Sequence, residues 1–311
     1  MKLAALIVLV ALVTPAAAAA PALGLVTGIE NGTYHAFGLD LKRLVKADGI
    51  AVNVYPSRGS VDNLAALHGR PGVHMGIVQS DVLDFIAGED GNPLLAQIAK
   101  RLRVVFPLYT EEVHIVARRD IAVFEQLEGK RVAIGLEGSG AHLTARLMFK
   151  LADLHPAELV TMDPAQAVAR LKAGDIDAMV YVAASPVNLL KERFTAADGV
   201  ALVPIVSKSI LEAYDAVELA ANSYPWQDRP VMTVAVKAVL VSFELEGAAC
   251  ERLGQFAQHV VEGMDRLARH GHPTWRRVDL AYELKGWTRS ECVRKYIDST
   301  GTVQASPSHG R

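Results

Sequence analysis

Short apolar segments alternate with amphipathic helical segments along most of this 311-residue chain. Segments such as Leu23–Thr27, Val73–Val78 and Ile176–Val182 are rich in β-branched residues, which strands favour. Between such segments, apolar residues recur three or four positions apart, as in Leu143 and Leu147, so that each helix buries one face. Continuous apolar strands between such helices predict an α/β fold whose parallel sheet is covered on both faces.

The same patterns extend to the whole chain. Strands are expected at Leu23–Thr27, Ala51–Tyr55, Val73–Val78, Leu102–Leu108, Glu112–Ala117, Arg131–Gly135, Leu159–Met162, Ile176–Val182, Val200–Pro204 and Val231–Val236. Residues 244–269 predict one long helix. No repeat or linker divides the chain, and two extended apolar segments, Thr110–Val116 and Thr233–Val241, are placed to cross between two lobes. We therefore expect lobe 1 at 23–110 plus 242–298 and lobe 2, with the hinge strands, at 111–241.

The two ends of the chain differ from this pattern. Lys2, the apolar run Leu3–Val13 and the alanines Ala16–Ala20 predict a signal peptide over residues 1–20, cleaved between 18 and 22. The apolar run is shorter than the roughly 20 residues that a membrane-spanning helix needs. Residues 299–311 are rich in Ser, Gly, Thr and Pro, and this composition predicts a disordered tail. The expected location is the periplasm.

Composition limits the partners and cofactors. A net charge of −2 gives no electrostatic footprint for nucleic acid. The two cysteines, Cys250 and Cys292, permit one disulfide in an oxidising compartment, or else are two unpaired small apolar residues. Their spacing makes no zinc motif, and we expect no metal, no cofactor and a monomer.

Three segments share the design of a strand end, a loop of small residues and a helix start: 27–34, 56–61 and 135–142. The unpaired N–H groups and positive dipole of a helix N-terminus form an anion site, and in α/β sheets ligands bind at the carboxyl ends of the strands. A single loop of this kind is more simply ordinary turn chemistry, but three in one chain favour a ligand cleft. Gln79 and Ser80 follow another strand, and tyrosine suits such a cleft through its apolar face and hydroxyl group. The candidate ligand-binding residues are Gly28, Asn31, Gly32, Thr33, Tyr34, Arg58, Gly59, Ser60, Gln79, Ser80, Gly138, Ser139, Gly140, Tyr181 and Tyr224.

Enzyme signatures are missing from the sequence. It contains no G-x-x-x-x-G-K-[ST], G-x-S-x-G or H-E-x-x-H, and the glycines of 135–140 do not follow the dinucleotide-binding pattern. The carboxylate pair Glu111-Glu112 has no identifiable partner, and we interpret it as structural. We therefore predict a binding protein with no catalysis; a transferase-type enzyme on the same fold is the alternative from another class.

Taken in order, these motifs resemble the TAXI-type solute receptors of tripartite ATP-independent periplasmic (TRAP) transporters, from about Leu23 to Asp265. The matching stretches are Gly28…Gly32-Thr33-Tyr34…Gly38, Gly59-Ser60-Val61-Asp62-Asn63-Leu64, Gly76-Ile77-Val78-Gln79-Ser80-Asp81-Val82, Leu108-Tyr109…Glu111…His114-Ile115-Val116-Ala117, Val132-Ala133-Ile134-Gly135…Gly138-Ser139-Gly140 and Tyr224-Pro225.

The resemblance implies a type II periplasmic-binding-protein fold: two Rossmann-like lobes, a ligand cleft and a two-strand hinge. It also implies a small carboxylate ligand, either a glutamate-like amino acid or a hydroxy or keto acid, and delivery to a sodium-driven membrane permease. A receptor for an ABC importer or a sensor kinase is the alternative on the same fold. Two residues depart from the family pattern. Arg58 would clamp a carboxylate in a bidentate manner, and Glu30 would hold a substrate amine, unless both point to solvent.

Overall fold

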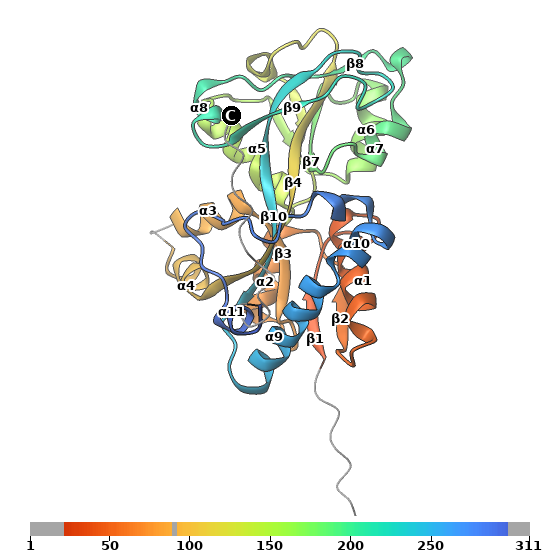
Figure 1. The fold of residues 1–311 in the computed structure, drawn as a ribbon. Helices are drawn as coiled ribbons and strands as arrows, with labels where there is room; N and C mark the ends of the chain where they lie inside the picture. The colour runs from red at the N-terminus through yellow and green to blue at the C-terminus, as the bar shows by residue number, and fades with distance from the viewer. Residues whose placement is uncertain (1–21, 89–91, 298–311) are drawn as a thin grey trace, which may run out of the picture.

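The computed structural model describes residues 22–88 and 92–297 (Figure 1). The predicted signal peptide at 1–20 and the predicted tail at 299–311 lie outside the described residues. In chain order the elements are β1 (Leu23–Val26), α1 (Thr33–Lys46), β2 (Val52–Tyr55), α2 (Ser60–Gly69), β3 (Met75–Gln79), α3 (Ser80–Gly88), α4 (Pro93–Arg101), β4 (Leu102–Arg118), η1 (Phe124–Leu127), β5 (Arg131–Ala133), α5 (Gly140–Leu151), β6 (Glu158–Val160), α6 (Pro164–Ala173), β7 (Ala178–Ala183), α7 (Asn188–Arg193), η2 (Ala196–Asp198), β8 (Val200–Leu202), α8 (Lys208–Leu211), β9 (Asp215–Leu219), β10 (Val231–Phe243), α9 (Gly247–Glu262), α10 (Met264–His270), η3 (Pro273–Arg277) and α11 (Glu291–Ile297).

Local sequence sets where individual helices begin and end, as α6 illustrates. Its N-cap residue Asp163 accepts a 2.8 Å hydrogen bond from the N–H of Ala165, and Pro164 occupies the first helical turn. The helix ends at Gly174, whose φ of 80° places it in the left-handed region that glycine adopts without steric cost.

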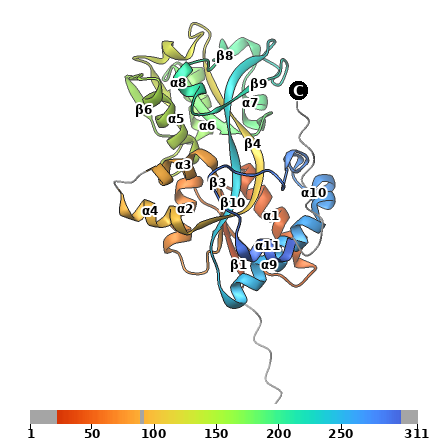
Figure 2. The ribbon, with the colours of Figure 1, turned by 60° about the vertical axis from the view of Figure 1, so that its left-hand side comes forward.

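The strands form one continuous sheet in the order β2-β1-β3-β10-β4-β7-β5-β6, with β8 added to β4 and β9 added to β10. The two long strands β4 and β10 pair with each other in antiparallel register from Leu102 opposite Phe243 to Glu112 opposite Ala235. Figures 1 and 2 show that this pair runs the length of the molecule and connects two lobes. Lobe 1 contains α1–α4, β1–β3 and α9–α11, and lobe 2 contains α5–α8 and β5–β9.

Each lobe buries both faces of its part of the sheet, so that the apolar core has four parts. In lobe 1, Leu25 and Ile77 pack under α1, α9 and α11, while the adjacent Val26 and Val78 pack on the opposite face under α2, α3 and α4. In lobe 2, one face packs against α5 and α8 and the other against α6 and α7. Alternate strand residues therefore enter different parts of the core, which explains why the strands are apolar at nearly every position.

Three secondary-structure predictions need correction. The sheet is mixed, because β10 lies antiparallel to β3, β4 and β9, and β4 lies antiparallel to β7 and β8. The two strands predicted at 102–108 and 112–117 are one strand, β4, and β10 extends to Phe243. Strand β9, at Asp215–Leu219, was not predicted; most of its residues are at least partly exposed, and a strand of this kind lacks a continuous apolar run.

The helix predicted at 244–269 is interrupted. Helix α9 ends at Glu262 and α10 begins at Met264. A Cβ atom at Gly263 would lie 2.6 Å from Leu44 Cδ1 and 2.9 Å from the carbonyl oxygen of His259, so the close packing of this bend against α1 requires glycine. The hydrophobic periodicity continues through the bend and did not reveal it.

The C-terminal segment is held together by a disulfide and is attached to α1 of lobe 1 by hydrogen bonds and ring stacking. Cys250 and Cys292 form a disulfide between α9 and α11, which settles the open question of their pairing. Asp40 of α1 accepts hydrogen bonds from Trp275 Nε1 at 2.9 Å and from the N–H of His272 at 2.7 Å. The Trp275 ring also stacks on Phe37, with 4.0 Å between the ring centroids.

Candidate functional site

A cleft of about 690 Å³, including its open mouth, lies between the two lobes, where β4 and β10 pass from one lobe to the other. Lobe 1 contributes the loop before α1, the start of α2 and the end of β3. Lobe 2 contributes the loop between β5 and α5, the start of α6 and the end of β7. All of these segments are at or just after the carboxyl ends of strands, where α/β sheets bind ligands.

Eleven of the predicted ligand-binding residues line this cleft: Gly28, Gly32, Thr33, Tyr34, Arg58, Gly59, Ser60, Gln79, Ser139, Gly140 and Tyr181. The structure thus brings together residues from five separate segments of the chain. The lining includes the N-termini of α1, α2 and α5. Helices α1 and α2 are preceded by Gly32 and Gly59, neither of which caps its helix with a side chain, so the first-turn N–H groups receive no side-chain acceptor from these positions.

Four predicted residues do not line the cleft. Asn31 is exposed, and Ser80 instead accepts a 3.0 Å hydrogen bond from the N–H of Lys237. Gly138 lies behind the cleft, where its carbonyl accepts a 3.0 Å hydrogen bond from the N–H of Asp62. Tyr224 is completely buried in the core of lobe 2, and its hydroxyl lies 2.7 Å from His114 Nε2.

Arg58 lies at the edge of the cleft with its charge already paired. Its Nε and Nη2 atoms donate to the two carboxylate oxygens of Asp62, at 2.6 and 2.8 Å. The guanidinium is more than half exposed, and the adjacent carboxylate raises its pKa. The bidentate clamp expected for a ligand carboxylate is therefore occupied by Asp62, which lies four residues later in the first turn of α2.

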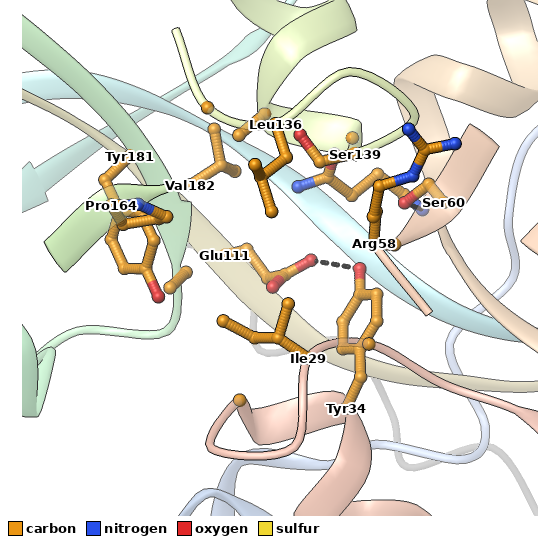
Figure 3. Close-up of a pocket in the computed structure, with 18 of the residues that line it drawn as sticks. Ile29, Tyr34, Arg58, Ser60, Glu111, Leu136, Ser139, Pro164, Tyr181 and Val182 are labelled. Carbon is orange, nitrogen blue, oxygen red and sulfur yellow. Dashed lines mark hydrogen bonds between the residues drawn. The ribbon is translucent and has the colours of Figure 1, made fainter. Parts of the chain in front are cut away.

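Glu111, which we had interpreted as structural, lies at the centre of the cleft. Its Oε2 atom accepts a 2.6 Å hydrogen bond from the hydroxyl of Tyr34, as Figure 3 shows, and its side chain is nearly completely buried. The neighbouring Glu112 does have a structural role, because it pairs with Arg277 and accepts a 2.7 Å hydrogen bond from the N–H of Ser185. Successive residues of a strand face opposite sides of the sheet, so the side chains of Glu111 and Glu112 must point in opposite directions. Two adjacent carboxylates within an otherwise apolar strand were the sequence signal that one of them faces the cleft.

Burial dominates the electrostatics of the cleft. It raises the pKa of Glu111 to about 8. Hydrogen bonds from Tyr34 and Gln79 lower this pKa, and the nearby carboxylates of Asp81 and Glu112 raise it. Burial also raises the pKa of Tyr181 to about 12. Both tyrosine hydroxyl groups of the cleft are consequently neutral near pH 7 and act as hydrogen-bonding groups.

The two lobes touch around the cleft through residues that leave little space. At Gly59, whose φ is 129°, an added Cβ atom would lie 3.3 Å from Ser139 Cα. An added Cβ atom at Gly140 would lie 1.7 Å from Gln79 Oε1. Asp81 of α3 accepts hydrogen bonds from Thr144 at 2.6 Å and from Tyr214 at 3.3 Å, both in lobe 2. The conformation described here is therefore one in which the lobes are in direct contact.

Residues 25–244 match the NMT1-like family, and this range includes lobe 2 and the whole cleft lining but not helices α9–α11 of lobe 1. The chain belongs to the NMT1-like family. Among the residues that the structure describes, no helix is long and apolar enough to cross a membrane, and no group of three or more His, Cys, Asp or Glu side chains is arranged to hold a metal ion.

Several solved structures resemble this NMT1-like chain in fold, among them a periplasmic binding protein. MatC from Rhodopseudomonas palustris, solved with bound malate, has 15% sequence identity and a TM-score of 0.53, and the match covers 89% of this chain and 98% of MatC. The periplasmic binding protein BugD has 11% identity and a TM-score of 0.52, with coverage of 90% and 93%. An ancestral arginine-binding protein bound to arginine has 17% identity and a TM-score of 0.50, with coverage of 81% and 98%. The predicted α/β type II periplasmic-binding-protein fold, with two lobes, a cleft and a two-strand connection, is confirmed.

Proposed function

We propose that this protein is an extracytoplasmic solute receptor that binds a small carboxylate in the cleft and delivers it to a sodium-driven TRAP membrane subunit. The arrangement that carries the proposal is the convergence of the N-termini of α1, α2 and α5, from both lobes, on one cleft. Backbone N–H groups and helix dipoles at such termini stabilise a carboxylate without a cationic side chain. This matters because Arg58 already pairs with Asp62.

The ligand side of the proposal is supported by the cleft lining. We assign the carboxylate to the loops that contain Gly32, Ser60 and Ser139, which bring backbone and hydroxyl donors to the cleft lining. Ile29, Leu136 and Pro164 add apolar surface on two sides of the same space (Figure 3). A small ligand with one charged end and a compact apolar body fits such a lining. A glutamate-like amino acid and a hydroxy or keto acid both meet this description.

The motion that we propose is closure of the lobes about β4 and β10, with lobe 1 at 23–110 plus 242–298 and lobe 2 at 111–241. Both boundaries fall within or at the end of the two long strands that the lobes share. Because carboxylate contacts come from both lobes, the ligand binds the closed form more tightly than the open form and shifts the equilibrium toward closure. The membrane subunit would recognise the closed form.

The experiment is a thermal-shift screen with glutamate, glutamine, 2-oxoglutarate, 2-hydroxyglutarate, C4-dicarboxylates, sulfonates and sugars. A ligand at 100 times its Kd stabilises the folded protein by about 2.7 kcal/mol, which raises the Tm by a few degrees at this chain length. A Tm increase with a carboxylate supports the receptor. If sugars or other uncharged solutes raise the Tm and no carboxylate does, the ligand class is wrong although the fold stands.

The membrane partner requires a separate experiment. Uptake of the identified ligand is measured in membrane vesicles that contain the permease encoded beside this gene, with the purified protein added outside. We expect uptake to follow an imposed sodium gradient. Uptake that requires ATP would assign the receptor to an ABC importer, and a neighbouring sensor kinase without a permease would assign it to signalling.

A further inference from the structure

Glu111 is a buried carboxyl group that the proposed carboxylate ligand alone does not explain. It lies on the floor of the cleft, on β4, and its side chain is 4% exposed. Among the described residues, no Lys, Arg or His nitrogen lies within ion-pairing distance of it. A buried carboxyl group without a cation is unfavourable in its charged form, so a group of this kind in a binding cleft calls for a partner.

We propose that this partner is the ammonium group of the ligand, so that the receptor selects α-amino acids over the corresponding hydroxy and keto acids. The inference rests on the proposed function and chooses between the ligand classes that it left open. Glu111 would be the specificity-determining residue, and Tyr34 would position it.

The geometry of the cleft separates two charges. The N-termini of α1, α2 and α5 enter the cleft from both lobes, and the carboxyl group of Glu111 lies between Tyr34 and Tyr181 (Figure 3). A ligand between them would direct a carboxylate to the helix termini and an adjacent cation to Glu111. An α-amino acid carries an ammonium group and a carboxylate on the same carbon atom, so one small ligand can meet both within the cleft.

The carboxyl group is also held in one orientation. Tyr34 donates a 2.6 Å hydrogen bond to Oε2, and the Gln79 side chain interacts with the same carboxyl group. Hydrogen-bond donors stabilise the ionised form of a carboxylate. Glu30, the other acidic residue near the loop before α1, is exposed and does not line the cleft, so it does not compete for this role.

If Glu111 binds the ligand ammonium group, ligand binding must release a proton. Burial raises the pKa of Glu111 to about 8, so in the empty cleft at pH 7 the group is mostly protonated. Binding of an ammonium group requires the carboxylate, so the Glu111 proton leaves to solvent as the amino acid binds. The titratable groups that face or act on Glu111 are Tyr34 from α1, Asp81 from α3, Tyr109 and Glu112 from β4, and Tyr181 from β7. The three tyrosines stay neutral below pH 9, and Asp81, whose pKa burial raises to about 6, is already mostly ionised at pH 7, so the proton is released by Glu111.

The test is isothermal titration calorimetry with glutamate, glutamine, 2-oxoglutarate and 2-hydroxyglutarate at pH 6, 7 and 8, in two buffers with different ionisation enthalpies. For the amino acids we expect release of close to one proton at pH 7 and an affinity that rises about tenfold per pH unit below pH 8. For the oxo and hydroxy acids we expect weaker binding and no proton release. Proton release is measured on the unaltered protein and does not depend on whether a variant folds.

Two variants complete the experiment. Glu111→Gln should weaken amino-acid binding at least 100-fold at pH 8 and abolish proton release, while 2-oxoglutarate binding changes only a few-fold. The matched control Glu30→Gln removes an exposed carboxylate from the neighbouring loop and should leave both properties unchanged.

Tighter binding of the oxo or hydroxy acid, with no proton release and no selective effect of Glu111→Gln, would overturn the inference and leave the proposed function intact. If no carboxylate of either class binds, the proposed function fails and this inference fails with it.

Discussion

Thr144 of lobe 2 donates a 2.6 Å hydrogen bond to the buried carboxyl group of Asp81 in lobe 1. Tyr214, also in lobe 2, donates a second hydrogen bond to the same oxygen at 3.3 Å. Asp81 is at the start of α3 and lies outside the lining of the candidate ligand cleft. Opening of the lobes must therefore break contacts that are independent of the ligand, and these contacts favour the closed form.

The substitution Thr144→Val should shift the receptor toward the open form. Valine keeps the shape of threonine and removes the hydroxyl, and a hydrogen bond to a buried carboxyl group contributes about 1.5 kcal/mol, which corresponds to a roughly tenfold weaker ligand affinity. Small-angle scattering should give a larger radius of gyration for the ligand-free variant. Thr161→Val, at an exposed position, is the control and should change neither quantity. Unchanged affinity and scattering in Thr144→Val would show that this contact does not affect closure.

The substitution Gly140→Ala should prevent full closure. The added Cβ atom would lie 1.7 Å from Gln79 Oε1 and 2.7 Å from Ser60 Oγ, and both of these atoms belong to the opposite lobe. We expect ligand affinity to fall at least tenfold, measured by calorimetry, because the two lobes can no longer contact the ligand together.

Gly69→Ala is the matched control for this change. No atom lies within 4 Å of a Cβ added at Gly69, so affinity should be unaffected. If Gly140→Ala binds ligand with unchanged affinity, the Gln79 side chain moves aside without reducing affinity, and the close approach at this point does not limit closure.

The free energy of unfolding of the ligand-free protein should fall as the pH rises from 6.5 to 8. Burial raises the pKa of Glu111 from its ordinary value of 4.5 to about 8, so between these values the folded state binds more protons than the unfolded state, and stability decreases with pH. Buried His114, whose pKa is lowered to about 4, has the opposite effect, and Asp81, whose pKa is raised to about 6, has the same effect as Glu111, but most of both contributions falls below pH 6.5. Over the remaining 1.5 pH units the loss amounts to about 2 kcal/mol.

Urea unfolding at pH 6.5, 7.25 and 8 measures this loss. Glu111→Gln cannot ionise and should be nearly independent of pH in this range, whereas Glu30→Gln should behave like the unaltered protein. Equal slopes for all three proteins would contradict the raised pKa of Glu111.

Removal of the disulfide should destabilise lobe 1 without changing ligand affinity. The Cys250–Cys292 bond closes a loop with a sequence separation of 42 residues and joins α9 to α11, away from the cleft. The double substitution Cys250→Ser and Cys292→Ser should lower the free energy of unfolding by about 3 kcal/mol, measured by urea unfolding. Addition of a reductant should weaken the unaltered protein to a similar extent and leave the double variant unaffected. A loss of ligand affinity in the folded double variant would show that α9 and α11 communicate with the cleft.

The sequence by itself determined the fold class and most of the cleft lining. Apolar residues at nearly every strand position required a sheet that is covered on both faces, and the four parts of the core show how this requirement is met. Small-residue loops between a strand and a helix placed Gly32, Ser60 and Ser139 at helix N-termini. These are local properties, because a few neighbouring residues decide them.

Only the tertiary structure decided which polar groups face the ligand space. Whether Glu111 or Glu112 points into the cleft depends on the register between β4 and its neighbours, and the single apolar run contains no signal for that choice. Tyr224 was available to a ligand until the fold placed its hydroxyl beside His114 in the core. The physical reason is the same in each case. The partner of a polar side chain is set by packing between segments that are far apart in the sequence and meet only in the folded chain.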